Sequence, residues 1–129
     1  LMREARAGAF AVRIGPRVLI GVGVGASSNF LGTSEWLEGG TGPELAPRSK
    51  PCAVALENGA FVFGGSDGVG GSSAAEWITP AGDKTSFPFA GQGRFDHSCT
   101  KLEDGSVLIA GGRNLGGALN DLWRFVPPL

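Results

Sequence analysis

The sequence lacks tyrosine altogether, contains a single histidine, and shows almost no imbalance of charge. Its 12 acidic and 11 basic residues give a formal net charge of −1 and form no block of either sign. This distribution gives no support to binding of nucleic acid or of an acidic membrane. The longest apolar run, residues 18–26, is far too short to span a bilayer. We therefore expect neither a nucleic-acid partner nor a membrane partner.

Cysteine is also scarce, with Cys52 and Cys99 as the only two. They form no Cys-x-x-Cys spacing, and no cluster of cysteine and histidine along the sequence indicates a metal site. This usage favours two free thiols in a cytoplasmic protein over a disulfide. A disulfide between them would require Cα atoms within about 7 Å of each other.

Glycine, by contrast, is abundant, with 23 glycines and 8 prolines among 129 residues. Such a share is found in disordered chains, but here the glycines separate short apolar runs and therefore predict turns.

One pattern occurs three times along the chain. Each copy has an arginine, a short strand, a turn, an apolar strand that ends in glycine, and a strand that carries tryptophan. The arginines lie 42 and 46 residues apart, at Arg6, Arg48 and Arg94. A period in the forties that is built from short strands is typical of propeller blades.

Each copy predicts the same order of strands. First strands are expected at residues 8–14, 51–56 and 98–102, and third strands at 34–37, 75–79 and 122–126. The second strands, residues 18–20, 61–63 and 107–110, are wholly apolar, so both of their faces should be buried. A fourth strand is expected at residues 84–89, shrinks to about 44–46 in the first copy, and is missing from the third.

The turns between first and second strands have characteristic residues. Gly15-Pro16 occupies this position in the first copy, and Asn58-Gly59 and Asp104-Gly105 in the others. The last two dipeptides favour tight hairpins in which both central residues take positive φ. Polar, glycine-rich loops follow the second strands, at residues 24–33, 66–73 and 113–119.

These residues resemble the kelch repeat. The third copy is closest, through Arg94, His97, Asp104-Gly105, Gly111-Gly112 and residues 120–125. The resemblance implies an all-β fold, a kelch-type β-propeller with three four-stranded antiparallel blades at about residues 6–47, 48–93 and 94–129. Together they would form one partial propeller over residues 1–129, with the last blade incomplete.

The chain departs from the kelch pattern in several ways, among them Gly21-Val22 in place of the first Gly-Gly and the missing tryptophan of the fourth strand. The family usually carries tyrosine in the third strand, where this chain has Leu37, Ile78 and Phe125. Kelch propellers usually have six or seven blades, and three cannot close a ring. We therefore expect either that a longer chain supplies the remaining blades or that copies of the chain associate.

The resemblance also implies where a partner would bind. In kelch domains the segments before the first strands open towards a partner-binding face, where Arg48 and Arg94 could hold acidic peptides by bidentate contacts. A structural alternative is that these arginines pair with a carboxylate or loop carbonyls of the next blade. The loops after the apolar strands supply further partner-binding candidates: Phe30, Asp67, Arg113 and Asn114.

His97 carries no clear sign of catalysis. A catalytic role would require a nucleophile or ligand at defined geometry, although His97 and Cys99 share one side of an extended strand. The resemblance implies a histidine that hydrogen-bonds in a turn or between blades, and places Cys52 and Cys99 on the innermost strands. We expect no catalytic residue, cofactor or metal. The predicted function is a non-catalytic protein-interaction module, and the alternative is a structural subunit or a kelch appendage of a larger enzyme or complex.

Overall fold

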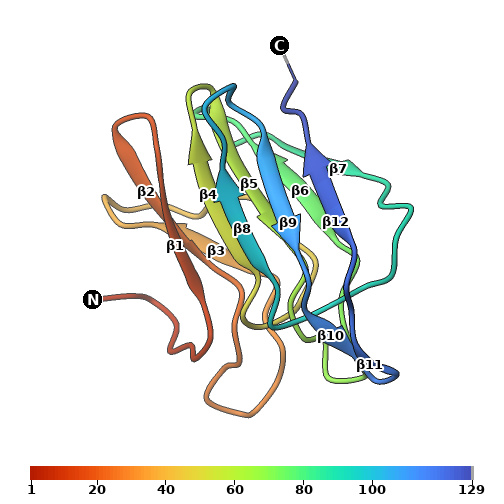
Figure 1. Cartoon of the computed structure of the whole chain (residues 1–129). Helices are drawn as coiled ribbons and strands as arrows, with labels where there is room; N and C mark the ends of the chain where they lie inside the picture. The colour runs from red at the N-terminus through yellow and green to blue at the C-terminus, as the bar shows by residue number, and fades with distance from the viewer. Residues whose placement is uncertain (129) are drawn as a thin grey trace.

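The computed structural model describes residues 1–128 and consists of antiparallel strands with no helix in that range (Figure 1). No segment of these residues therefore forms a helix that could cross a membrane. The first repeat forms a sheet of β1 (Phe10–Ile14), β2 (Arg17–Gly21) and β3 (Ser34–Trp36). The second forms β4 (Cys52–Leu56), β5 (Gly59–Phe63), β6 (Ala75–Ile78) and β7 (Lys84–Phe87). The third forms β8 (Ser98–Lys101), β9 (Val107–Ala110) and β12 (Leu122–Phe125).

The three sheets are stacked through their first strands. Strand β4 contacts β1 on one side and β8 on the other, and Figure 1 shows these three strands side by side. The second sheet therefore lies between the other two. One hydrophobic core fills the space between the first and second sheets, and another lies between the second and third.

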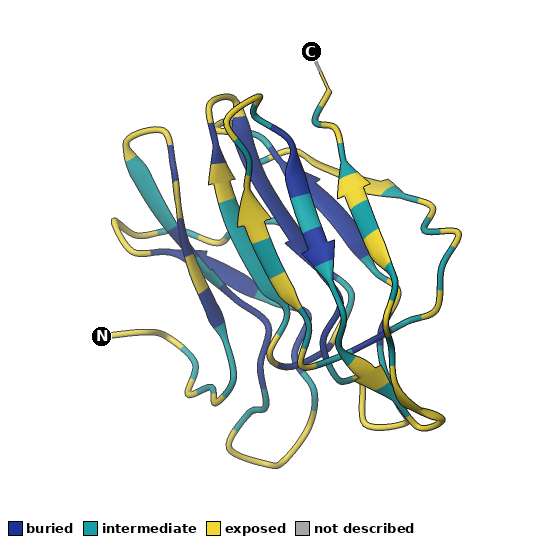
Figure 2. Cartoon of the chain, viewed as in Figure 1, coloured by how far each residue is buried: buried dark blue, intermediate teal, exposed yellow. Residues whose placement is uncertain are grey.

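Strand β5 contributes to both cores. Ala60 and Val62 belong to the first core, and Phe61 and Phe63 to the second, because successive side chains of a strand point to opposite faces. All five residues of β5 are buried, and Figure 2 shows this strand as a dark blue band. The expectation that an apolar second strand has both faces buried is confirmed for this repeat.

The same expectation is wrong for the outer sheets. Burial in β9 alternates residue by residue, and β2 is only half buried at several positions, because each outer sheet packs on one side alone. On the open face of the third sheet, Leu122 is 66% exposed. On the open face of the first, Ala11 and Arg13 are exposed.

Only the second sheet has four strands, so the prediction of a four-stranded first blade is wrong, whereas the absence of a fourth strand from the third repeat was expected. In the first repeat, Gly39 and Gly40 both take positive φ, and Leu45 donates its backbone N–H to the carbonyl of Gly32 instead of to β3. A single bridge between Glu35 and Thr41 is all the pairing that follows β3. In the third repeat, no fourth strand pairs with β12 among the described residues.

The hairpin turns differ in detail from those expected. In the second repeat Leu56 pairs with Gly59, so Glu57 and Asn58 form the turn, and neither has positive φ. Gly59 is required for another reason, since a Cβ there would lie 2.5 Å from the carbonyl oxygen of Ile78. In the third repeat only Gly105 of the predicted dipeptide takes positive φ.

A small hairpin forms within residues 113–119, which were predicted as a polar, glycine-rich loop. It consists of β10 (Arg113–Asn114) and β11 (Gly117–Ala118). A two-residue turn, Leu115-Gly116, connects the two strands, and Gly117 takes positive φ.

The two cysteines form a disulfide, which corrects the expectation of free thiols. Their Cα atoms lie 5.9 Å apart, inside the range that a disulfide requires. The expectation failed because cysteine usage indicates the redox compartment, whereas the pairing arises from equivalent positions on the neighbouring strands β4 and β8.

The stacking of the sheets predicts that two apolar side chains contribute very differently to the free energy of unfolding. Phe61 is 1% exposed and stacks on Phe125 with ring centroids 3.9 Å apart, so Phe61→Ala should lower the free energy of unfolding by about 3–5 kcal/mol. Leu122→Ala, on the open face of β12, should change it by less than about 0.5 kcal/mol. Urea denaturation measures both, and equal losses would contradict the stacking order.

Candidate functional site

The connections that precede the first strands and those that follow the second strands gather at one end of the stack, the lower end in Figure 1. Backbone hydrogen bonds link them to one another. The N–H of Ser49 donates to the carbonyl of Ser66, that of Arg94 to Ser72, and that of Phe95 to Arg113. This end was expected to carry the partner-binding loops.

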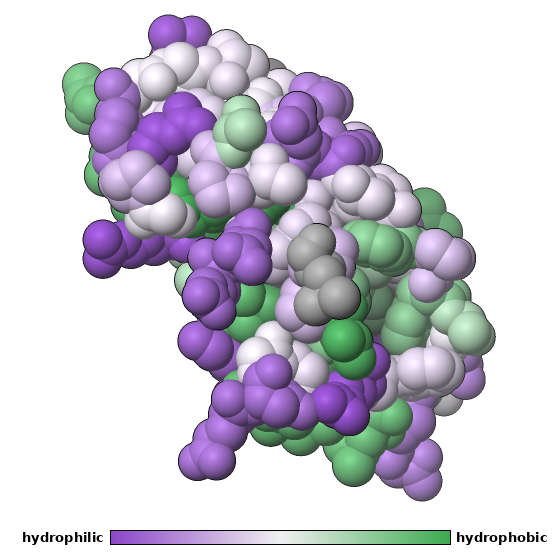
Figure 3. Space-filling view, turned by 90° about the horizontal axis from the view of Figure 1, so that it is seen from above, coloured by the Kyte–Doolittle hydropathy of each residue, from purple (hydrophilic) through white to green (hydrophobic). Residues whose placement is uncertain are grey.

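The opposite end carries the hairpin turns and is seen from above in Figure 3. Hydrophilic residues are scattered across the visible surface of this end, with smaller hydrophobic areas between them.

A groove of about 450 Å³ opens at the loop end between residues 67–71 and the β10–β11 hairpin. Asp67 and Asn114, both predicted as partner-binding residues, line it together with Gln92. The carboxylate of Asp67 accepts hydrogen bonds of 2.9 Å from the N–H groups of Val69 and Gly70 and so shapes one wall. The Asn114 amide donates to the Gln92 side chain at 2.6 Å on the other.

Two apolar side chains stand beside these polar groups. Val69 and Leu115 are each 81% exposed, and both line the groove. A Cβ at Gly70 would lie 3.4 Å from Leu115 Cγ, so the two walls are close together here. Sequence reasoning missed Val69, Leu115 and Gln92, although an apolar residue flanked by glycine or polar residues in such a loop was a usable signal for the first two.

The other two predicted loop residues lie near the groove but do not line it. Arg113 is exposed, and its Nε donates to the carboxylate of Asp96 at 2.8 Å. Its guanidinium also lies over the ring of Phe95, 4.9 Å from the centroid. Phe30 is half-buried and packs where a Cβ at Gly68 would come within 2.6 Å of its ring, so it supports the loop from behind.

Arg48 and Arg94 are completely buried, which corrects their prediction as partner-binding residues. The Arg48 guanidinium donates to the carbonyl of Gly64 at 2.7 Å and to the carboxylate of Glu76 at 2.6 Å. Burial lowers the pKa of Arg48, while the charge of Glu76 and its hydrogen bond act in the opposite direction.

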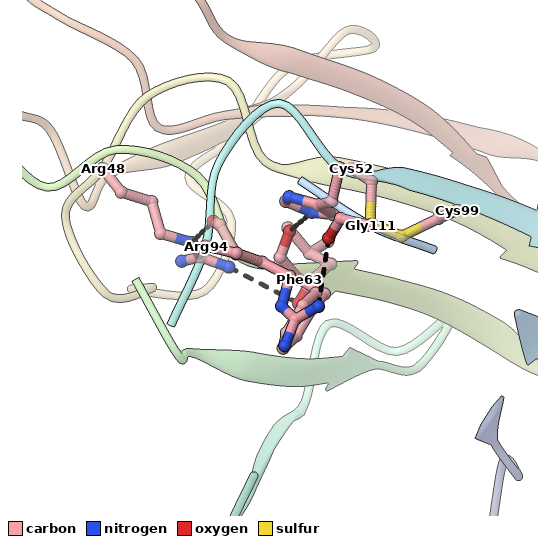
Figure 4. The surroundings of a disulfide bond; sticks show 9 residues. Arg48, Cys52, Phe63, Arg94, Cys99 and Gly111 are labelled. Carbon is pink, nitrogen blue, oxygen red and sulfur yellow. Dashed lines mark hydrogen bonds between the residues drawn. A yellow bond between two sulfur atoms is a disulfide. The ribbon is translucent and has the colours of Figure 1, made fainter. Parts of the chain in front are cut away.

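Arg94 makes the corresponding contacts in the third sheet. It donates to both carboxylate oxygens of Asp121, at 2.7 and 2.9 Å, and to the carbonyl of Gly111 at 3.0 Å. The hydrogen bonds from Arg94, and then that from the Trp123 indole, hold the pKa of Asp121 well below its usual range. Figure 4 shows Arg48 and Arg94 close to the disulfide, with Arg94 directed at Gly111.

The first repeat carries the same arrangement. Arg6 donates to the carbonyls of Val22 and Thr33, each at 2.9 Å, and lies 3.3 Å from the carboxylate of Glu35. In all three repeats the arginine therefore pairs with an acid on or beside the third strand of its own sheet. The alternative prediction, that these arginines pair with groups of the next blade, was correct that a carboxylate is the partner. It was wrong about the position of that carboxylate, which belongs to the same repeat. An acid one or two residues before each third-strand tryptophan was the signal that could have identified these partners: Glu35, Glu76 and Asp121.

His97 lies beside the disulfide. Its Nε2 is 2.9 Å from the carbonyl oxygen of Phe63, and burial is the main cause that lowers its pKa. A nitrogen of its ring and the sulfurs of Cys52 and Cys99 all lie within 4.8 Å of one another. The sequence showed no cluster of cysteine and histidine, because Cys52 comes from a strand of the neighbouring repeat.

Comparison with protein-family models and with curated proteins finds no match to this chain.

The buried pairs predict a contrast with the exposed pair at the loop end. Glu76→Ala leaves the charge of Arg48 buried without its carboxylate and should lower the free energy of unfolding by about 3–5 kcal/mol. Asp96→Asn removes the charge of the exposed partner of Arg113, keeps a residue type that tolerates the positive φ of this position, and should cost at most about 1 kcal/mol. Chemical denaturation of both variants measures this contrast, and a Glu76→Ala variant as stable as Asp96→Asn would show that the buried pair is not needed.

Proposed function

We propose that this chain is a non-catalytic protein-interaction module of kelch type, which holds an extended segment of a partner protein in the groove at its loop end. The observation that carries the proposal is the pair of exposed apolar side chains, Val69 and Leu115, beside the polar groups of Asp67 and Gln92. Interaction sites combine apolar anchors with a polar surround in this way.

Three features support kelch-type blades within this proposal. Each repeat is an antiparallel meander, each second strand is followed by residues with positive φ, and neighbouring sheets pack through their first strands. Under this proposal the three sheets are blades of an incomplete propeller, at about residues 6–47, 48–93 and 94–129.

A partner segment would use two kinds of contact in the groove. Its apolar side chains would cover Val69 and Leu115, and burying them removes exposed apolar surface from water. Its polar groups would bond to Asp67 and Gln92 at the walls. Arg113 precedes Asn114, which lines the groove, and its guanidinium is exposed although it pairs with Asp96. It would favour an acidic residue at one end of the partner segment.

The groove predicts a specific loss of binding. Peptides selected from a displayed library on the immobilised wild-type chain should bind a Leu115→Asp, Val69→Ser double variant at least about ten-fold more weakly, because the apolar anchors are gone. Leu122→Ser, an equally simple change to an exposed leucine on β12, is the matched control and should retain affinity. Equal binding by all three proteins would refute the groove as the site.

The second candidate function is a structural subunit of a larger assembly, and the open faces of the outer sheets favour it. Leu37 beside the first sheet and Leu122 and Val126 at the third are each about two-thirds exposed. In a propeller these faces would be covered by further blades, from a longer chain or from a second copy.

The mass of the chain in solution tests the version in which copies cover one another. Self-association predicts that sedimentation gives a multiple of 13.2 kDa and that Leu122→Asp, which places a charge on the open face of β12, returns the chain to a monomer. A wild-type chain that remains at 13.2 kDa over the whole concentration range would eliminate self-association and leave completion by further blades.

A further inference from the structure

The three side chains at the junction of the second and third sheets form a set of soft metal ligands. Cys52 lies at the start of β4, Cys99 lies on β8, and His97 directly precedes β8. Their two sulfurs and one ring nitrogen lie within 4.8 Å of one another. Two thiolates and one imidazole are ligands that Zn²⁺ takes in proteins.

The hydrogen bond of His97 identifies which ring nitrogen is available. Because a carbonyl oxygen only accepts, the contact of Nε2 with the Phe63 carbonyl places the proton on Nε2. Nδ1 then carries the lone pair. It is buried and has no hydrogen-bond partner among residues 1–128. Zinc-bound histidines commonly donate their second ring nitrogen to a carbonyl in this manner, which orients the ring.

Two glycines leave the space that His97 occupies. A Cβ at Gly64 would lie 2.4 Å from Cε1 of His97, and a Cβ at Gly112 would lie 2.9 Å from its Cβ. His97 therefore occupies space that a side chain at either of these two positions would fill. The histidine is placed beside the sulfurs before any ion arrives.

The cluster is accessible from solvent. Cys52, His97 and Cys99 are each half-buried, so each residue has part of its surface open to solvent. Figure 4 shows the disulfide between two strands, with the Phe63 and Gly111 backbone close by. Both a reductant and an ion can therefore reach the sulfurs.

We propose that reduction of the Cys52–Cys99 disulfide creates a Zn²⁺ site, formed by the two thiolates and His97 Nδ1, with the fourth position left to water. A dithiol reductant donates two electrons and two protons, so the sulfur–sulfur bond breaks, two thiols form, and the dithiol becomes a disulfide. Zn²⁺ then displaces the two thiol protons to solvent.

The disulfide and the metal site cannot be present at the same time. Tetrahedral coordination with Zn–S bonds of about 2.3 Å separates the two sulfurs by about 3.8 Å, so they cannot remain bonded. In the oxidised chain the link between β4 and β8 is covalent, and in the reduced chain the ion replaces it. The join between the second and third sheets is thus held in both redox states.

Cobalt(II), which takes the place of zinc and absorbs visible light, is the probe for this site. The chain is reduced with a dithiol, which is removed under nitrogen, and Co²⁺ is then titrated. The proposal predicts one Co²⁺ per chain with thiolate-to-metal charge-transfer absorption, displacement by one equivalent of Zn²⁺, and no such absorption in the oxidised chain.

Three variants identify the ligands. Cys99→Ser should abolish the charge-transfer band. His97→Gln keeps a side-chain amide that can donate to the Phe63 carbonyl but lacks the ring nitrogen, so it should weaken Co²⁺ binding at least about ten-fold while circular dichroism stays unchanged. Asp96→Asn, a matched change at the neighbouring carboxylate, should bind Co²⁺ within about two-fold of wild type.

Two results would overturn the proposal. One is a reduced, folded wild-type chain that gives no charge-transfer band with Co²⁺. The other is a His97→Gln chain that binds Co²⁺ as tightly as wild type, which would leave two thiolates without the histidine. Peptide binding at the loop groove is measured separately in the oxidised chain, so neither result depends on it.

Discussion

The structure depends on a buried arginine at the entry to each sheet. The guanidinium of Arg48 joins three segments of the chain, because it bonds to Ala46 at the end of the first repeat, to Gly64 directly after β5, and to Glu76 on β6. A buried guanidinium loses its hydration, and only good geometry to charged and carbonyl acceptors offsets that loss. Because the arrangement occurs in all three repeats, the segment before each first strand is bonded to residues on or beside the second and third strands of its sheet in the same way.

The loop end is shaped by these same arginines, although two of them never reach its surface. Arg94 bonds through its backbone to Ser72, and the next residue, Phe95, pairs with Arg113 at the base of the β10–β11 hairpin. The two walls of the groove are therefore tied to the buried core on either side. Loops on a rigid support of this kind present side chains such as Leu115 in a defined place, which is what a binding surface requires.

Local features of the sequence predicted most of the strands. Strand β5 was expected from three consecutive apolar residues, 61–63, and extends by only two residues more. The hairpin turn at Gly105 was expected because aspartate-glycine favours a turn. The fourth strand of the second repeat was predicted at residues 84–89, and β7 forms there at Lys84–Phe87. Turn residues and apolar runs act over a few positions, so their signal is present in the chain itself.

The candidate site was less predictable, and the reasons are physical. Arg48 and Arg94 were predicted as partner-binding residues because the kelch resemblance implied a binding face before the first strands, and an arginine in that position gives no sign of whether it will be buried. Asp67 and Asn114 do line one groove, but the exposed anchors Val69 and Leu115 became apparent only once two loops from different repeats lay side by side.

The sequence by itself determined the order and spacing of the strands, the turns between them and their threefold repetition, because these follow from local apolar patterns and from glycine. The tertiary structure alone decided which charges pair, which face of each sheet is open, and that Cys52, His97 and Cys99 meet. Those outcomes depend on contacts between residues as far apart as Phe63 and His97, 34 positions along the chain. Which distant segments become neighbours is a property of the stacked sheets, since burial and desolvation act on whatever the packing brings together.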